Sequence, residues 1–255
     1  MKDVLIALAG NQNCGKTTLF NRLTGSNQHV GNFPGVTVEK KMGQIKSFKE
    51  ASLVDLPGIY SLSPYTSEEV VTRDFILKEN PDIIINIVDA TNIERNLYLS
   101  LQLMELQKPM VIALNMMDEV TASGNSIDVE KLSRHLRCPV VPISASKNEG
   151  IDDLIRVVKK QIREEKQAVN LDFCTGEVHR AIHSIAHIIE DHARNAKVPM
   201  RFASTKLVEG DEPMQQELHL HQDDIDIIEK NSQKHGGCAA DRPRGGTCGY
   251  ALFLY

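Results

Sequence analysis

The segment Gly10-Asn-Gln-Asn-Cys-Gly-Lys-Thr17 fits the spacing G-x-x-x-x-G-K-[ST], which is typical of loops that bind nucleotide phosphates. Glycines let consecutive backbone N–H groups turn toward a polyphosphate. Lys16 supplies a positive charge for the β- and γ-phosphates, and the Thr17 hydroxyl is a ligand for Mg²⁺. The segment therefore predicts a site for a nucleoside triphosphate.

The residues on either side of this segment support the prediction. Residues 4–9 form an apolar run typical of a buried strand, and residues 16–23 have the pattern of a helix. This strand–loop–helix order directs the N-terminus of the helix, which favours anions, at the phosphates. The alternative, a glycine turn that matches by chance, does not explain the flanking elements.

The composition argues against several classes of protein. The 255 residues are enough for one large domain or two small ones, and the net charge of −5 argues against a nucleic-acid binder. The five cysteines include no C-x-x-C pair, as expected in a reducing cytosol. We expect no signal peptide, and no apolar run reaches the ~20 residues that span a bilayer. A cytoplasmic polypeptide is therefore expected.

Alternating strand and helix patterns predict an α/β domain over residues 1–165. The glycine-rich residues 25–41 show no period and are expected to form a long loop beside the phosphate site. A tight turn at residues 49–50 is expected to join the two strands that follow. The remaining elements are strands over 43–48, 51–56, 83–88, 110–114 and 140–143, and helices over 67–78, 93–106, 128–136 and 151–163.

Only helical patterns follow, over residues 177–193, 201–209 and 214–232. We expect a small all-α domain at residues 166–235 and assign no structure to the tail, residues 236–255, which is rich in Gly, Arg and Cys. His179, His183 and His187 recur every four residues and share one helix face. They could ligate a transition metal, but a structural or surface role beside the apolar stripe is favoured.

Three further motifs end predicted strands, at the same edge of the sheet as the phosphate loop. In Asp55-Leu-Pro-Gly58, the carboxylate suits the magnesium shell and the glycine N–H can face a γ-phosphate, although this motif is also common in ordinary turns. In Asn115-Met-Met-Asp118, the carboxylate can accept from the ring N–H and the exocyclic amine of guanine. Ser144-Ala-Ser146 can offer a backbone N–H to the guanine carbonyl oxygen.

Together these motifs resemble those of the translation-factor class of small GTPases. The loop Val30-Gly-Asn-Phe-Pro-Gly-Val-Thr-Val-Glu39 is similar to the first switch of the FeoB family, bacterial ferrous-iron transporters whose cytoplasmic N-terminal part is a GTPase followed by a helical domain. Residues 92–99 and 206–212 also resemble FeoB stretches, and the resemblance covers residues 2–211. It implies a Ras-like P-loop GTPase domain with a mostly parallel sheet of six or seven strands flanked by helices.

The resemblance also implies roles for individual residues. The implied catalytic residues are Lys16, Thr37, Asn13 and Gly58, the implied Mg²⁺ ligands are Thr17, Thr37 and Asp55, and the implied K⁺ ligand is Asn13. For Asn13, a role as a turn former is the alternative. The implied nucleotide contacts are Gly10, Asn11, Gln12, Asn13, Cys14, Gly15, Lys16, Thr17, Thr18, Gly35, Val36, Thr37, Asp55, Leu56, Pro57, Gly58, Asn115, Met116, Asp118, Ser144, Ala145 and Ser146.

Three positions in these motifs bear on the rate of hydrolysis, the affinity for nucleotide and the reactivity of the loop. Ile59 stands where Ras-like enzymes carry a glutamine that orients the attacking water. Hydrolysis is therefore expected to be slow, to rely on charge neutralisation by Lys16, Mg²⁺ and K⁺, and to be faster in K⁺ than in Na⁺. Met116 replaces a lysine common in small GTPases, which implies modest affinity and fast exchange. Cys14 lies beside a helix N-terminus, which can lower a thiol pKa, but a small neutral residue that fits the loop is favoured over a redox role.

The expected function is that of the cytoplasmic GTPase part of a ferrous-iron transporter in the bacterial inner membrane. The implied partners are a guanine nucleotide, the transmembrane region of the same transporter and small cytoplasmic Feo accessory proteins, and no nucleic acid. One alternative is a soluble regulatory or ribosome-assembly GTPase whose second domain contacts RNA. Another is a structural or signalling switch in which the helical domain slows the loss of GDP.

Overall fold

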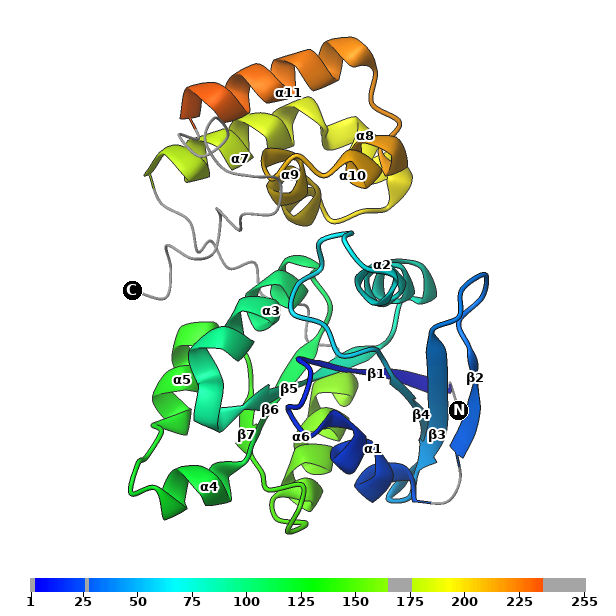
Figure 1. The fold of residues 1–255 in the computed structure, drawn as a ribbon, viewed down its shortest axis with the longest axis vertical. Helices are drawn as coiled ribbons and strands as arrows, with labels where there is room; N and C mark the ends of the chain where they lie inside the picture. Colours follow the sequence, from blue (N-terminus) through cyan, green and yellow to red (C-terminus); the bar gives the residue numbers. More distant parts are fainter. Residues whose placement is uncertain (1–2, 26–27, 165–175, 236–255) are drawn as a thin grey trace. The chain divides into compact units, whose positions relative to one another are not determined.

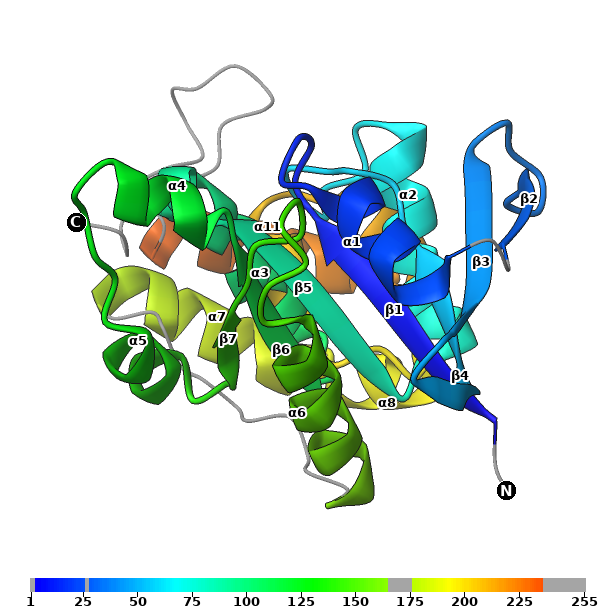
Figure 2. The same ribbon diagram turned by 90° about the horizontal axis from the view of Figure 1, so that it is seen from below.

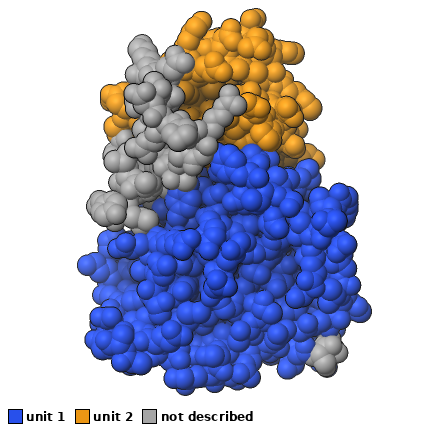
Figure 3. Space-filling view, viewed as in Figure 1, with its two compact units in different colours: residues 1–171 blue, residues 172–255 orange. Residues whose placement is uncertain are grey.

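The computed structural model describes residues 3–25, 28–164 and 176–235. The chain divides into two compact units, residues 1–171 and 172–255 (Figure 3). The predicted domain boundary after residue 165 falls between described ranges and stays a prediction. The tail, residues 236–255, lies outside the described residues.

The first unit is built on a seven-stranded sheet with the order β2-β3-β4-β1-β5-β6-β7. Strands β4, β1, β5, β6 and β7 run parallel, while the β2–β3 and β3–β4 pairs are antiparallel. This confirms the predicted α/β fold with a mostly parallel sheet. The strands are β1 (Val4–Gly10), β2 (Gln28–Asn32), β3 (Glu39–Ile45), β4 (Phe48–Asp55), β5 (Ile83–Asp89), β6 (Met110–Asn115) and β7 (Val140–Pro142).

Helices cover both faces of this sheet, with α1 and α6 on one face and α2 and α3 on the other (Figures 1 and 2). A capping box at Thr66 and Glu69 starts α2, which continues as a π-helical turn over Phe75–Glu79. The helices of the unit are α1 (Lys16–Thr24), α2 (Ser67–Asp74), α3 (Ile93–Glu105), α4 (Met117–Ala122), α5 (Val129–Leu136) and α6 (Ile151–Arg163).

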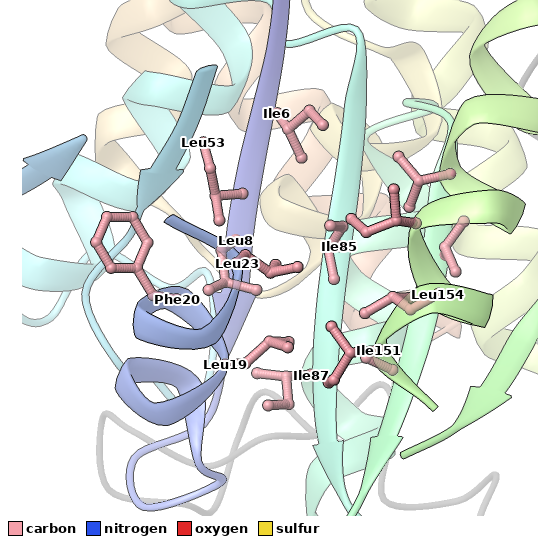
Figure 4. Close-up of a cluster of buried hydrophobic side chains, with 14 of the residues drawn as sticks. Ile6, Leu8, Leu19, Phe20, Leu23, Leu53, Ile85, Ile87, Ile151 and Leu154 are labelled. Atoms are coloured by element: carbon pink, nitrogen blue, oxygen red, sulfur yellow. The ribbon is translucent and has the colours of Figure 1, made fainter. Parts of the chain in front are cut away.

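The core on the α1 and α6 face fixes the position of the phosphate loop. Leu8 of β1 and Ile85 of β5 are fully buried beneath Leu19 of α1 and Leu154 of α6 (Figure 4). Each such side chain stabilises the fold by about 2 kcal/mol relative to an exposed one. Because β1 and β5 are covered on both faces, they carry the continuous apolar runs that made them recognisable.

Two predictions in this unit were wrong. Residues 25–41 do not form one long loop, since β2 pairs with β3 as an antiparallel hairpin. Most of the side chains of β2 are exposed, so the hairpin has no apolar alternation to announce it. The turn between β3 and β4 lies at residues 46–47, not 49–50. The short helix α4 was not predicted, because six residues carry too little periodicity.

The second unit is a set of helices, as expected. Helix α7 packs against α9 and α11, with Ala181, Ile182 and Ile185 buried. Two of the expected helices are each divided in two, at Ile189 and at residues 218–221. Its helices are α7 (Gly176–Ile188), α8 (Glu190–Ala196), α9 (Met200–Val208), α10 (Glu212–Glu217) and α11 (Gln222–His235). No helix among the described residues is long and apolar enough to cross a bilayer.

The three histidines of α7 lie beside its apolar stripe. His183 and His187 are exposed, His179 is half-buried, and the ring centroids of His179 and His183 are 4.3 Å apart. Across the described ranges, no group of three or more His, Cys, Asp or Glu side chains is arranged to hold a metal ion. The favoured structural or surface role of these histidines stays a prediction.

An ion pair with a buried lysine lies at the C-terminal end of α9. The Lys206 side chain is 1% exposed, and its Nζ lies 2.7 Å from Oε2 of Glu209. The ammonium also lies 5.8 Å from the centre of the Phe202 ring. A charge-assisted hydrogen bond to a buried ammonium is among the stronger ones in proteins, so this pair contributes to the stability of the second unit.

We predict that Glu209→Ala lowers the free energy of unfolding of the second unit by about 2 kcal/mol, because it removes a charge-assisted hydrogen bond to the buried Lys206 ammonium. Urea unfolding followed by circular dichroism measures the loss. Glu229→Ala, a truncation of an exposed glutamate of α11, serves as the control and should change the value by less than about 0.5 kcal/mol. Equal effects of the two substitutions would contradict the prediction.

Candidate nucleotide-binding site

The phosphate loop joins β1 to α1 and depends on two glycines. A Cβ on Gly10 would lie 2.5 Å from Cγ2 of Ile87, so the loop leaves β1 with no room for a side chain. Gly15 has a φ of 90°, and a Cβ there would lie 2.3 Å from Nδ2 of Asn115. The backbone therefore turns tightly into α1, whose first N–H groups have no helical carbonyl to bind and favour an anion.

Lys16 and Asp55 meet at this loop, as the sequence predicted for two residues of one site. Nζ of Lys16 lies 2.6 Å from Oδ1 of Asp55, and their side chains are 11% and 6% exposed. Burial raises the pKa of Asp55, and the Lys16 ammonium opposes that rise. The pair places one positive and one negative group where β1 and β4 end, side by side in the sheet.

The D-x-x-G segment packs directly on the phosphate loop. The N–H of Ile59 donates to the carbonyl of Gly10 at 3.2 Å. A Cβ on Gly58 would lie 3.2 Å from Cα of Gln12, so a larger residue would press the two loops apart. The Ile59 side chain is 2% exposed, which places it in the core, where it can neither bind nor orient a water molecule.

The structure does not bring Thr37 to Lys16, Thr17 or Asp55. Gly35, Val36 and Thr37 lie in the exposed turn of the β2–β3 hairpin, which stands apart from the β1–α1 loop in Figures 1 and 2. Phe33 anchors the base of this turn.

The anchor is an aromatic contact. The Phe33 ring packs edge-on against Phe75 with centroids 6.0 Å apart, and the Lys40 ammonium lies 5.6 Å from both ring centres. The tip beyond Phe33 is held by fewer contacts, with the N–H of Val36 bonded to the Phe33 carbonyl at 3.3 Å.

Asn115 connects the two ends of the site. Its side chain is buried, and Nδ2 donates to the carbonyl of Cys14 in the phosphate loop at 2.9 Å. Its Oδ1 accepts from the N–H of Ala145, also at 2.9 Å. The Ala145 N–H is therefore already engaged, which leaves neighbouring N–H groups of that loop for a base.

Asp118 faces the same loop. Hydrogen bonds from Ser144 and Lys147 lower the pKa of Asp118, and its Oδ2 lies 3.1 Å from Nζ of Lys147. The carboxylate is thus kept ionised and able to accept from a base. Met116, in the left-handed conformation with a φ of 63°, turns the chain from β6 into α4.

The end of the site at which the guanine base is expected, around Asp118 and Ser144–Ser146, is called the base end. The sequence did not predict two residues near it. Lys147 directly follows the Ser144–Ser146 motif, so its position was a usable signal. Arg22 of α1 donates to the carbonyls of Ala145 and Ser146. Its partners are 123 and 124 residues away, and no local pattern announces such a contact.

The other loop residues divide by exposure. Gln12, Asn13, Thr17 and Thr18 are exposed, and Asn13 has a φ of 64°, a conformation that asparagine tolerates better than most residues. Burial raises the pKa of Cys14 to about 11. The thiol therefore stays protonated, which favours a small neutral residue over a redox role.

Asn11 is an unusual member of the loop. It is 2% exposed, and neither polar atom of its side-chain amide has a partner among the described residues.

These groups suit a nucleoside triphosphate with Mg²⁺. An ammonium, a glycine turn and a helix N-terminus are the chemistry that binds phosphates. The exposed hydroxyl of Thr17 and the carboxylate of Asp55 are oxygen ligands of the kind Mg²⁺ prefers. The exposed amide of Asn13 offers an oxygen of the kind that hard cations take.

Two family models match this chain. A family model described as Ferrous iron transport protein B matches residues 4–158, which is more than half of the chain. A second model, the FeoB cytosolic helical domain, matches residues 175–236.

Curated relatives extend well beyond this chain. The Fe(2+) transporter FeoB of Salmonella typhimurium is 50% identical over 159 residues, which are 60% of this chain and 21% of that protein. A fusion of Fe(2+) transport protein A with Fe(2+) transporter FeoB from Porphyromonas gingivalis is 39% identical over 218 residues, 83% of this chain and 26% of the fusion. The chain thus spans about a quarter of the length of these relatives.

A solved structure has the same fold over nearly the whole chain. It is the crystal structure of NFeoB from S. thermophilus bound to GDP, AlF₄⁻ and K⁺, with a TM-score of 0.79 and 43% identity over 94% of this chain and 93% of that one. The family suggested by the sequence motifs is confirmed. The chain belongs to the family of ferrous iron transport protein B and comprises its N-terminal G domain and its cytosolic helical domain.

Proposed function

We propose that this chain binds GTP with Mg²⁺ and K⁺ and hydrolyses it to GDP and phosphate. The observation that carries the proposal is the Lys16–Asp55 ion pair at the mouth of a glycine loop, with Asn115 and Asp118 at the base end. The S. thermophilus relative supports it, because AlF₄⁻ beside GDP stands in for the phosphoryl group in transfer.

In this proposal the phosphates are held by the loop and by Lys16. The ammonium exchanges part of its contact with Asp55 for the β- and γ-phosphate oxygens, and the first N–H groups of α1 bind the same oxygens. Gly58, packed against Gln12, directs its N–H at the γ-phosphate. Thr17, Thr37 and Asp55 would hold Mg²⁺, and Asn13 would hold K⁺; both cations would help to neutralise the charge that develops in the transition state.

Two features of the chain limit the rate. Ile59 is buried, so no side chain at this position orients the attacking water, and the intrinsic hydrolysis is slow. Thr37 must move from the exposed hairpin turn to reach the Mg²⁺ site. Because the tip of this turn is held by few contacts, the movement costs little and can serve as the nucleotide-dependent switch.

The transport role is a further part of the proposal. The family's name and the curated relatives support the coupling of this switch to Fe²⁺ uptake through a transmembrane region outside this chain, with the G domain on the cytoplasmic side of the bacterial inner membrane. The Porphyromonas gingivalis fusion supports a small Feo accessory protein as a partner. Guanine nucleotide remains the small-molecule partner, with no role for nucleic acid.

For base recognition, we predict that Asp118→Asn weakens GTP binding by about a hundredfold, since it removes two hydrogen bonds of roughly 1.5 kcal/mol each to a charged acceptor. The new amide should donate to the 2-oxo group of xanthine, so XTP binding should improve. Competition against a fluorescent GTP analogue measures both affinities. Asp153→Asn, an exposed position on α6, should change neither; unaltered GTP binding by Asp118→Asn would refute the assignment.

For the cation, we predict that wild type hydrolyses GTP faster in K⁺ than in Na⁺ at matched ionic strength. Asn13→Gly keeps the positive φ accessible but removes the amide oxygen, so it should abolish the K⁺ advantage while GDP binding persists. Phosphate release in the two salts measures this. If Asn13 only forms the turn, Asn13→Gly will retain the full K⁺ stimulation.

For transport, we predict that Lys16→Met in the full-length transporter abolishes both GTP binding and Fe²⁺ uptake, because the phosphates lose their main side-chain charge. Uptake of radioactive iron by cells lacking their own transporter measures the effect. Lys159→Met on α6 is the control. Normal uptake with Lys16→Met would separate iron transport from nucleotide.

A further inference from the structure

Arg22 lies on α1, beyond the phosphate loop, and reaches the base end of the site. Its Nε donates to the carbonyl of Ala145 at 3.2 Å, and Nη2 donates to the carbonyl of Ser146 at 2.7 Å. In the described parts of the chain no carboxylate pairs with this guanidinium. Its charge is therefore directed at two consecutive carbonyls, the fork geometry that arginine provides.

The same loop is held from its other side. Oδ1 of Asn115 accepts from the N–H of Ala145, and Nδ2 of Asn115 donates to Cys14. Arg22 and Asn115 thus fix both the carbonyl and the N–H of Ala145. Residues 144–147 form the loop after β7, here called the base loop. Because Arg22 and Lys16 lie on the same short helix, the base loop and the phosphate loop are joined through α1 as well as through Asn115.

The two carbonyl contacts decide where one N–H points. In a trans peptide the C=O of one residue and the N–H of the next lie in one plane and point in opposite directions. With the Ala145 carbonyl turned toward Arg22, the N–H of Ser146 must point away from α1. This N–H donates to no acceptor in the described ranges, whereas the N–H of Lys147 donates to Oγ of Ser144 at 3.4 Å.

We infer that Arg22 is a positioning residue for guanine. By holding the carbonyls of Ala145 and Ser146, it aims the Ser146 N–H at the 6-oxo group of the base and slows the release of the nucleotide. The inference rests on the proposed binding of guanine nucleotide and adds a residue that determines specificity and dwell time. Arg22 does not touch the nucleotide itself.

The chemistry of the base separates this role from that of Asp118. Asp118 accepts from the ring N–H and the 2-amino group, whereas the Ser146 N–H donates to the oxygen at position 6. Inosine diphosphate lacks the 2-amino group but keeps the 6-oxo group. The diphosphate of 2,6-diaminopurine riboside keeps the 2-amino group but carries an amine at position 6 and no proton on the ring nitrogen N1, so it also loses one Asp118 contact. Because Asp118 is unchanged in an Arg22 variant, that loss is the same with and without Arg22, and a change in Arg22 should affect only the part of the preference that depends on position 6.

The test measures the release of fluorescently labelled GDP from the whole chain, together with competition by the two analogues. Arg22→Met keeps the length of the stem and removes every donor, and we expect GDP to leave about tenfold faster, as for the loss of charge-assisted hydrogen bonds. The preference for GDP over the 2,6-diaminopurine nucleotide should fall by a similar factor. The preference for GDP over inosine diphosphate should stay constant.

Two further variants complete the design. Arg22→Lys keeps a point charge without the fork and should release GDP at an intermediate rate. Arg156→Met makes the same change on α6, where the side chain pairs with Asp153, and should behave as wild type. Thermal unfolding of each variant confirms that the fold is retained.

Unchanged GDP release from Arg22→Met would overturn the inference. So would an equal loss of affinity for all three nucleotides, which would mark a general structural effect. A wild-type chain that binds no GDP would overturn the proposed function and this inference with it. A wild-type chain that binds GDP, together with an unaffected Arg22→Met, would overturn the inference alone.

Discussion

The buried amide of Asn115 is the contact on which the rest of the site depends. Its side chain satisfies a carbonyl of the phosphate loop and an N–H of the loop that follows β7. A buried amide must find such partners, because an unpaired one costs about 1–3 kcal/mol. Both partners lie at the edge where the parallel strands end. The sheet order therefore brings the loops together, and Asn115 locks their separation.

The charges of Lys16 and Asp55, at the mouth of the phosphate loop, suit the binding of an anion. Lys16 and Asp55 neutralise each other at the mouth of the loop. Burial raises the pKa of Asp55, so the ionised carboxylate is less favoured there than in water. A polyphosphate offers Lys16 several oxygens in place of one carboxylate. A polyphosphate bound there would therefore offset the energetic cost of separating the ion pair.

The contrast between rigid and movable parts follows from packing. The phosphate loop, the D-x-x-G segment and the base loop are fixed by buried contacts such as Ile59 N–H to Gly10 and Asn115 to Ala145. The tip of the β2–β3 hairpin, which carries Thr37, is exposed, and Phe33 anchors the base of the hairpin turn. Segments with few buried contacts open at low free-energy cost, which suits a switch.

Much of the fold could be predicted, for identifiable reasons. The buried strands β5 and β6 are unbroken apolar runs, and Lys16 to Thr24 follows a phosphate loop that can only precede a helix. The β2–β3 hairpin was missed because its exposed side chains carry no alternation. The long helix expected at residues 177–193 is interrupted at Ile189, where no proline or glycine signals a break.

The sequence by itself determined the glycine-rich phosphate loop, the Asn115 and Asp118 motif of the proposed guanine site, and the absence of a polar side chain at position 59. These are encoded locally, in the spacing of a few residues. Only the tertiary structure decided that Arg22 donates to the carbonyls of Ala145 and Ser146, that Lys147 pairs with Asp118 and that Thr37 lies in an exposed hairpin turn. Such contacts join residues far apart in the chain and depend on strand order and side-chain direction, which no local spacing specifies.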